Sequence, residues 1–518
     1  MQRFSINLIT IYNYSNKIRM KNLLLAFAFL GGGMSAYAQN STEPILTLKG
    51  TVGEKVTLGL GVYDNFDIYS VDFGDGTLLT DTVCYQNGGL KGEDGKAKEG
   101  TTHTGITKFT GTVAGDGTIK VYGESDIWYL SLDKGTLPTS LNQEKMKKVV
   151  QFTISGAEVE TLDLTGLDDL KQFSFSQGSI EAINVSNNIN LTNLTINNNT
   201  ASKFDSKLAK LDVSKNVNLE QLNVMGASVG KPGLLQTLDL SNNAKLTSVY
   251  AQNNALTTVL LPIGATLTAI NLQNNQIESI DLSVVSSIKD PYLNNNKLTA
   301  VDLSKLKENS NLYLDGNQLT EVNILVTVKN LQLNNNKLTS VSLIDATASC
   351  KLENNLLTLA TLPTKPAGLN TDAKVKKFTY APQAALEVAE ALNMLDLTSQ
   401  LTATGILEAP ATTTFSFVTA SGTTLVEGTD YEVIEQGKFK FVKEQAEKVH
   451  GVLVNEGFPL FADNDAFVTT DFIIDTATDI QEVNVADGVG KVYNLQGVEV
   501  KQAQKGLYIQ NGKKMIRK

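Results

Sequence analysis

The sequence predicts a mainly β protein: a central solenoid of about ten turns, each of 19–28 residues, flanked by β-sandwich domains. Three observations predict it. Two apolar residues separated by one residue recur along the middle of the chain, in a first strip that begins at Phe152, Phe173, Leu194, Leu222, Val249, Ile270, Pro291, Leu312, Leu331 and Cys350. A second strip runs in phase with it, at Leu162, Ile183, Leu211, Leu238, Val259, Ile280, Val301, Val322, Val341 and Ala360. Asparagine recurs at a fixed distance after the first strip.

The spacing within each strip indicates stacked strands. Residues separated by one position point to the same side of a β-strand, so each apolar pair can face a common interior. Turns stacked about 4.8 Å apart would then form one long row of inward side chains. The pair Leu130 and Leu132 is a candidate for an additional turn before the first.

The recurring asparagines are predicted to be structural. Each lies five residues after the first apolar position, where the chain turns a corner and its backbone groups lose their strand partners. An inward amide has both donors and acceptors, so it can bond to backbone groups of its own turn and of the next one. One such buried group left unpaired costs about 1–3 kcal/mol. The predicted asparagine ladder is Asn254, Asn275, Asn296, Asn317, Asn336 and Asn355.

The stretches LTAINLQNNQI (267–277) and VKNLQLNNNKL (328–338) resemble the leucine-rich repeat, L-x-x-L-x-L-x-x-N-x-L, with a period similar to that of internalins. The resemblance implies a solenoid that binds its partners on a concave strand face. The chain departs from the pattern at Ala157 and Gly178, which stand in the asparagine position. Pro291 occupies a strand position and is expected to weaken the ladder of one turn.

The residues expected on the concave face are rich in tyrosine and amides. Tyrosine gives a large contact area at a small entropic cost, so the set is interpreted as a binding surface for a protein loop or a sugar ring. The alternative is that such residues simply suit exposed strands. The predicted ligand-binding residues are Tyr250, Gln252, Asn271, Gln273, Tyr292, Asn294, Tyr313, Asp315, Gln332, Asn334 and Lys351.

Two insertions lengthen adjacent turns, at residues 197–210 and 224–237. They are either tolerated drift or loops that form an edge of the ligand site. The second strip also carries a column of aspartates, which we interpret as turn-forming residues. Calcium needs six to eight oxygens around one point, and one carboxylate per turn does not converge, so no metal site is predicted. These aspartates are Asp163, Asp212, Asp239, Asp281 and Asp302.

The solenoid is predicted to span residues 128–362, between an N-terminal β domain (40–126) and a second β domain (370–476). The stretch VDFGDGTLL (71–79) resembles the DFGDGT of PKD-type modules. The strand and turn pattern of the second domain fits an immunoglobulin-like sandwich without a disulfide. Within it, residues 384–397 could form a helix or a strand.

Both ends of the chain indicate export. Residues 1–38 comprise an upstream extension and a signal peptide, with the apolar run LLLAFAFL (23–30) and a small-residue cleavage site at Ala36-Tyr37-Ala38. Residues 484–518 resemble the C-terminal sorting tails of type IX secretion in Gram-negative bacteria, with Gly497, Gly506 and Tyr508 at matching places. This resemblance implies an outer-membrane-associated or secreted surface protein. The tail also fits two hairpins that cap a domain, and whether it is cleaved or anchors the chain stays open.

The net charge of −10 argues against nucleic-acid binding, and no segment after the signal peptide is long and apolar enough to span a membrane. No HExxH, CxxC, GxSxG or Walker-type motif accompanies His103 and His450, so the sequence predicts no enzyme and no cofactor. Cys84 and Cys350 are expected to be free thiols.

The favoured function is binding of a protein or glycan in adhesion or host interaction. The alternatives are a surface spacer without a ligand and an exported glycan- or peptide-acting hydrolase.

Overall fold

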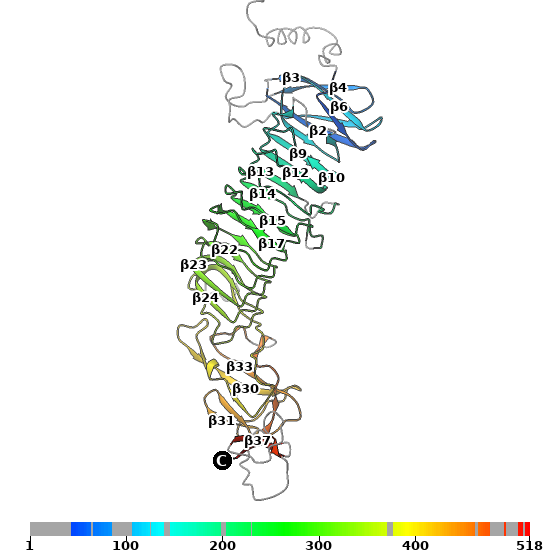
Figure 1. The fold of residues 1–518 in the computed structure, drawn as a ribbon. Helices are drawn as coiled ribbons and strands as arrows, with labels where there is room; N and C mark the ends of the chain where they lie inside the picture. The colour runs from blue at the N-terminus through cyan, green and yellow to red at the C-terminus, as the bar shows by residue number, and fades with distance from the viewer. Residues whose placement is uncertain are drawn as a thin grey trace, which may run out of the picture. The chain divides into compact units, whose positions relative to one another are not determined.

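The computed structural model is almost entirely β (Figure 1). It describes residues 43–63, 66–84, 106–124, 126–138, 146–197, 204–228, 230–369, 377–461, 465–476, 492–493, 506–510 and 513–517. The predicted signal peptide and His103 lie outside these ranges. Within them, no helix has the length and apolar character needed to cross a membrane. The chain divides into two compact units, Met1–Leu235 with Asn242–Leu246 and Gln236–Ser241 with Thr247–Lys518, and each is described by itself.

Unit 1 begins with two antiparallel groups of strands. Alternating burial along each strand, as in Leu46 and Leu48, provides the apolar faces of its core. One group has the order β4 (Leu78–Cys84), β3 (Phe66–Asp72), β6 (Thr118–Tyr122), β1 (Leu46–Lys49), β8 (Leu137–Pro138). The other has the order β5 (Thr107–Thr112), β2 (Lys55–Val62), β7 (Ile127–Leu132).

The solenoid of unit 1 starts directly on β7. Leu130 pairs in parallel with Phe152, so the additional turn suggested by the sequence is present. The row continues in register from Phe152 to Phe173, Leu194 and Leu222. The rungs are β9 (Gln151–Ser155), β11 (Gln172–Ser176), β13 (Asn193–Asn197) and β14 (Gln221–Asn223). The second strip forms its own parallel pair, β10 (Glu158–Asp163) with β12 (Ser179–Asn184).

Unit 2 contains the same first row. Val249 pairs with Ile270, which pairs with Pro291, and Leu312 pairs with Leu331, which pairs with Cys350. The predicted row is therefore confirmed within each unit, in a middle region of about ten turns. The rungs are β16 (Ser248–Tyr250), β19 (Ala269–Asn271), β21 (Pro291–Tyr292), β22 (Ser310–Tyr313), β23 (Glu321–Gln332), β24 (Ser340–Lys351) and β25 (Phe378–Thr379).

The second strip of unit 2 is paired less regularly. It forms β15 (Thr237–Asp239) with β17 (Thr258–Leu260), next to a short pair of β18 (Thr266–Leu267) with β20 (Ser287–Ile288). In β23 and β24 one strand carries both strips, and Val322 pairs with Val341.

The sequence predicted that Ala360 is the last inward residue of the second strip. This prediction is wrong, because Ala360 is exposed. Leu359 and Leu362 are buried instead, because a tight turn from Thr358 to Leu362 shifts the phase.

Two positions in the row have particular consequences. Pro291 is buried in a strand of two residues, and its rung pairs with the next one at a single position, Tyr292 opposite Tyr313. This agrees with the loss of a backbone donor at proline.

Cys350 is a fully buried free thiol whose pKa is raised by burial. It packs as a small apolar residue.

The ladder continues past residue 362. β25 pairs in parallel with β24, with Phe378 opposite Cys350. Gln383 then takes the place of an asparagine five residues after Phe378. Its amide donates to the carbonyls of Leu352 (2.8 Å) and Tyr380 (2.5 Å), and its oxygen accepts from the backbone N–H groups of Asn355 and Leu357.

The rest of unit 2 is built from small sheets around an aromatic core that includes Phe417, Phe439 and Phe441. Residues 384–397, left open between helix and strand, contain β26 (Ala391–Leu392) and β27 (Met394–Asp396), followed by the 3-10 helix η4 (Thr398–Gln400). The other strands are β28 (Thr402–Ala403), β29 (Ala411–Thr412), β30 (Thr414–Thr419), β31 (Tyr431–Glu435), β32 (Lys438–Phe441), β33 (Val449–Val454), β34 (Phe467–Val468) and β35 (Ile473–Ile474).

The C-terminal segment forms an antiparallel sheet of β36 (Val492–Tyr493), β37 (Gly506–Gln510) and β38 (Lys513–Arg517). In the pairing of β37 with β38, Gln510 lies opposite Lys513. Gly506 and Tyr508 lie in β37, whereas Gly497 is outside the described residues.

The six asparagines of the ladder are buried, and five of them share one bonding pattern. The amide of Asn275 donates to Ala251 O in the previous turn (3.1 Å) and to Leu272 O in its own turn (2.9 Å). Its oxygen accepts from Leu256 N (3.1 Å). Asn296, Asn317, Asn336 and Asn355 make the equivalent amide bonds to their own and the previous turn.

The asparagine that precedes each buried one has a different role. Asn253, Asn274, Asn295, Asn335 and Asn354 all have positive φ, between 55° and 59°. Asparagine tolerates this left-handed conformation better than most residues, and glycine replaces it at Gly316 (φ 66°). The Asn-Asn pair therefore combines a backbone that can turn with an amide that bonds inside the turn.

We expect Asn296→Ala to lower the free energy of unfolding by about 3 kcal/mol. It removes the bonds to Leu272 O, Leu293 O and Ile277 N, and each buried group left unpaired costs about 1–3 kcal/mol. Denaturant unfolding followed by circular dichroism measures the change. The control Asn295→Gly keeps the positive φ and should alter stability by less than about 1 kcal/mol. Equal effects of the two changes would contradict the ladder's structural role.

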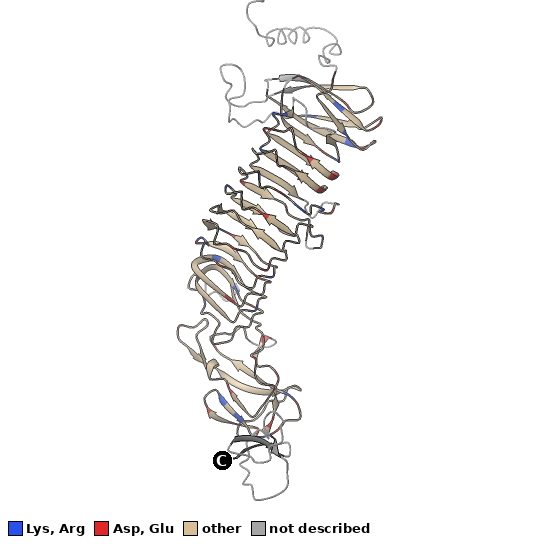
Figure 2. Ribbon diagram, viewed as in Figure 1, with Lys and Arg blue, Asp and Glu red and all other residues tan. Residues whose placement is uncertain are grey.

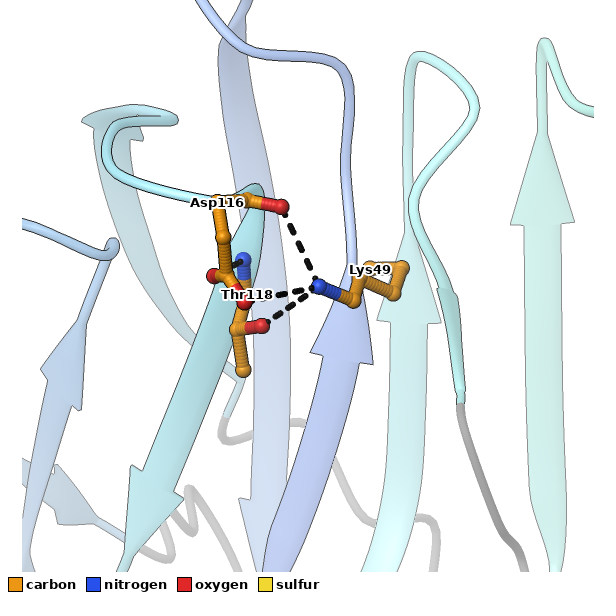
Figure 3. Close-up of polar contacts among 3 residues, drawn as sticks. All are labelled: Lys49, Asp116 and Thr118. Carbon is orange, nitrogen blue, oxygen red and sulfur yellow. Dashed lines mark hydrogen bonds and ion pairs between the residues drawn. The ribbon is translucent and has the colours of Figure 1, made fainter.

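A charged cluster stabilises the turn before β6 (Figure 3). Lys49 donates from Nζ to Thr118 Oγ1 (2.7 Å), Asp116 O (3.1 Å) and Asp116 Oδ2 (3.2 Å). Hydrogen bonds from the side chain and backbone of Thr118, followed by the bond from Lys49, lower the pKa of Asp116 from 3.8 to about 2. A carboxyl whose pKa is lower in the folded protein than in the unfolded chain stabilises the fold at pH values above its unfolded pKa. This stabilisation is lost as the pH falls through the pKa of the folded state.

We therefore expect this turn to weaken between about pH 4 and pH 2. NMR titration of the Asp116 carboxyl should show its pKa well below 3.8 in the wild type. Thr118→Val and Lys49→Met should each raise that pKa, because each removes a side-chain bond that lowers it. An unshifted wild-type pKa, or no effect of either change, would contradict this account.

Candidate ligand-binding face

The outward side chains of the unit 2 rungs form two columns on the face that the resemblance predicts to be concave. We call this surface the strand face. The middle column lies between the inward apolar positions and consists of Tyr250, Asn271, Tyr292, Tyr313, Gln332 and Lys351. The trailing column lies two residues further along each turn and consists of Gln252, Gln273, Asn294, Asp315, Asn334 and Glu353. Backbone pairing places successive members on neighbouring rungs.

The middle column contains a stacked aromatic pair. The rings of Tyr292 and Tyr313 lie 4.6 Å apart with an interplanar angle of 13°. Each ring therefore covers one face of the other. Tyr250 is more exposed, at 38%, and Thr379 extends the column one rung beyond Lys351.

The trailing column contains acceptor oxygens that lack a protein partner. Asn294 Oδ1, Asp315 Oδ1, Asn334 Oδ1 and Glu353 Oε2 are each buried without a hydrogen bond among the described residues. Native proteins bond most such groups, and each exception needs an explanation. These positions are consecutive: Asn295 N donates to Asp315 O, Gly316 N to Asn334 O and Asn335 N to Glu353 O.

Burial also affects the charges of this face. It raises the pKa of Asp315, while the bond from its own backbone N–H and the nearby Lys351 act in the opposite direction. Burial raises the pKa of Tyr313 as well, helped by Tyr292 and by the carboxylates of Asp290 and Asp315. In Figure 2 most of the ribbon is tan, with blue and red positions scattered along it. The strand face is polar and carries charges of both signs, at Lys351, Asp315 and Glu353.

The aspartates of the second strip form turns. Asp163, Asp239 and Asp281 each accept bonds from the backbone N–H and the hydroxyl of the residue two positions later, as at Ser283. Bonds from Ser214 lower the pKa of Asp212, and bonds from Ser304 lower that of Asp302. In the part of the chain that the structure describes, no group of three or more His, Cys, Asp and Glu side chains could hold a metal ion.

The insertions pack beside the second strip. Lys207, in the first insertion, pairs with Glu158 (2.9 Å) and Glu181 (3.5 Å) on β10 and β12. Lys231, in the second insertion, pairs with Asp205 in the first (3.1 Å). The two loops therefore contact one another, as stacked insertions should. Their described ion pairs lie along the second strip of unit 1.

Two sets of structural residues were not identified from the sequence. Asn188, Asn216 and Asn243 form a second asparagine ladder in unit 1, and each donates to two backbone carbonyls of the preceding turn. They lie five residues after Ile183, Leu211 and Leu238, so the spacing of the first ladder could have found them. The same spacing joins Phe378 to Gln383.

No family model matches the chain, and no curated protein matches it. Solved structures similar to it include the functional domain of InlJ from Listeria monocytogenes, described as including a cysteine ladder. That domain is 16% identical with a TM-score of 0.26, over 68% of this chain and 93% of the other. So slight a likeness carries no functional argument. The repeat register of the chain itself supports a leucine-rich-repeat-like solenoid.

Neutralising Asp315 should stabilise the protein. Because burial raises its pKa, the charged form is disfavoured in the folded state above the ordinary value of 3.8. We expect Asp315→Asn to raise the melting temperature at pH 7 by a few degrees at most, and to lose this advantage below pH 3.8. Differential scanning calorimetry at both pH values measures the effect.

Asp302→Asn is the matched control, because bonds from Ser304 lower the pKa of Asp302. It should lower the melting temperature at pH 7 and have little effect in acid. If both variants change stability in the same direction, the assigned environment of Asp315 is wrong.

Proposed function

We propose that this chain is a non-enzymatic, exported surface protein that binds a protein or glycan ligand through the strand face, in adhesion or host interaction. The N-terminal and C-terminal β domains act as PKD-like and immunoglobulin-like sandwich modules that flank the solenoid. The C-terminal segment acts as a type IX secretion-like sorting tail, so the protein resides at the outer membrane or is secreted. It requires neither a metal nor a cofactor.

The observation that carries the proposal is the polar character of the strand face. Its middle column holds the stacked pair Tyr292 and Tyr313 and the exposed Tyr250, and its trailing column consists of amides and carboxylates. Tyrosine rings and amides are also typical of surfaces that bind proteins and sugars.

A surface spacer without a ligand is the alternative. It would need only a solenoid that stays folded, and the strand face could vary without effect. The two functions therefore differ in what substitution of the middle column does to retention of any partner.

The test replaces Tyr250, Tyr292 and Tyr313 by Ala together in the full chain. Immobilised wild-type protein is exposed to host-cell extract, bacterial extract and a glycan panel, and retained partners are quantified by mass spectrometry or array signal. We expect at least a tenfold loss of binding, because aromatic anchors commonly contribute more than about 1.4 kcal/mol each. Loss of the ring stack should lower stability by only about 0.5–1.5 kcal/mol beyond the buried area.

The control replaces the exposed amides Gln276 and Asn323, which lie off the strand face, by Ala. It should retain every partner that the wild type retains. Equal retention by the tyrosine variant and the wild type would exclude the strand face as the site. Retention of nothing by the wild type would favour the spacer.

A further inference from the structure

We propose that the basic C-terminal segment of the chain, residues 491–518, docks on the exposed edge strand β31 of the β domain that precedes it. The strand of this segment that pairs with β31 is β38. The contact would cover an edge that is otherwise open to pairing with other chains. It is separate from the strand face and from the ligand of that face.

β31 is an exposed strand edge. It lies at the end of the sheet β27-β32-β31, and among the described strands it pairs with β32 alone. Val433 and Ile434 are neighbours in β31 and are 42% and 54% exposed. Adjacent residues of a strand point to opposite faces, so both faces of this edge are uncovered. An exposed apolar edge of this kind is a site at which another strand readily pairs.

The backbone of β31 also has a free side. Asp430 O accepts from Val442 N (3.0 Å) on the side of β32, whereas Tyr431 O accepts from Gly428 N (2.8 Å) in the preceding turn. Bonding groups alternate between the two sides of an antiparallel strand. The N–H and C=O of Val433 therefore point away from β32, where a further strand can bond to them.

The sequences of the two edges are complementary. Residues 432–435 of β31 read Glu-Val-Ile-Glu, an acid, two apolar residues and an acid. β38 is the last strand of the sheet β36-β37-β38, and its residues 514–517 read Lys-Met-Ile-Arg, a base, two apolar residues and a base. Antiparallel pairing places Glu432 opposite Arg517 and Glu435 opposite Lys514, and parallel pairing exchanges the two cations. Opposite charges and apolar pairs across neighbouring strands both stabilise a sheet.

The charge balance of the two segments favours the same contact. Residues 378–476 contain 15 Asp and Glu but only four Lys and no Arg, whereas residues 491–518 contain seven Lys and Arg and one Glu. Glu435 already has an ion pair with Lys438 (2.9 Å). Glu432 has no ion pair among the described residues, so its carboxylate is the main partner that β31 offers to a cation.

The C-terminal segment can reach this edge. Thr476, at the end of the domain, donates from its hydroxyl to Glu444 (2.9 Å), which follows β32 by three residues. Phe441, the last residue of β32, lies opposite Tyr431, the first residue of β31. The chain therefore leaves the domain close to the start of β31. Fifteen residues separate Thr476 from β36, and an extended chain of that length spans about 50 Å.

The experiment measures hydrogen exchange of the full chain by mass spectrometry, read on peptides that cover β31 and β38 and corrected for intrinsic rates. One variant reverses the charges of β31, Glu432→Lys with Glu435→Lys, and another those of β38, Lys514→Glu with Arg517→Glu. We expect each to speed exchange in both strands about tenfold, because undocking exposes amides such as that of Val433. The combined variant should recover the wild-type rate, since its charges are complementary again. High salt should speed exchange in the wild type.

The matched control reverses two exposed acids outside the sheet of β31, Glu408→Lys with Glu456→Lys. It changes the net charge as much as the β31 variant and should leave exchange in β31 at the wild-type rate. Circular dichroism verifies that each variant is folded. Light scattering over a wide range of concentration should give the mass of one chain, with protection of β31 independent of concentration.

Three results would overturn the inference. Equal exchange of β31 in the wild type and in the β38 variant means that the segment does not cover this edge. Faster exchange in both reversals, without recovery in the combined variant, means that these charges do not pair with each other. Protection that arises only as the chain dimerises assigns the edge to a second copy. The tyrosine test of the strand face is independent of all three results.

Discussion

The solenoid depends on one interaction, the bonding of a buried asparagine amide to backbone carbonyls of two successive turns. Where the chain leaves a rung it has no strand partner, and water is excluded from the corner. Asn275 links Ala251 O and Leu272 O, and its oxygen receives Leu256 N. Each corner is therefore satisfied only when a neighbouring turn is present, so stability is shared between adjacent turns in the manner of repeat proteins. The strand face follows from this stacking.

Much of this arrangement could be predicted from the sequence, because it is periodic. The apolar row from Phe152 to Cys350 required only alternation and a repeating step. The rung at Phe378 lies beyond a longer gap and ends in Gln383, so a search for asparagine passed over it. Ala360 was assigned inward because the step was extrapolated, but a local turn shifts the phase. Hydrogen bonding across one tight turn is not visible in a period of about twenty residues.

The candidate site was predictable in its members and not in its geometry. Alternation identified which side chains point outward, including Tyr292, Tyr313 and Asp315. It could not show that the two rings stack on one another, because rotamers depend on neighbours in space. It also could not show which oxygens lack partners, since that depends on every surrounding donor. Chain position between two strips also left open whether the insertions are tolerated drift or an edge of the ligand site, because it does not determine the side on which a loop folds back.

The two ladders of polar residues in unit 2 have opposite relations to stability. The inward asparagines satisfy groups that would otherwise be unpaired, and stability explains their presence. The trailing column does the reverse: Asn294, Asp315, Asn334 and Glu353 hold buried oxygens without partners, and a residue such as threonine would suit the strand better at lower cost. The inward ladder of unit 1 has the same feature, since the Oδ1 atoms of Asn188, Asn216 and Asn243 are also buried without a partner among the described residues. Unpaired buried oxygens therefore do not by themselves mark a binding surface, and it is the outward position of the trailing column that makes it part of the strand face.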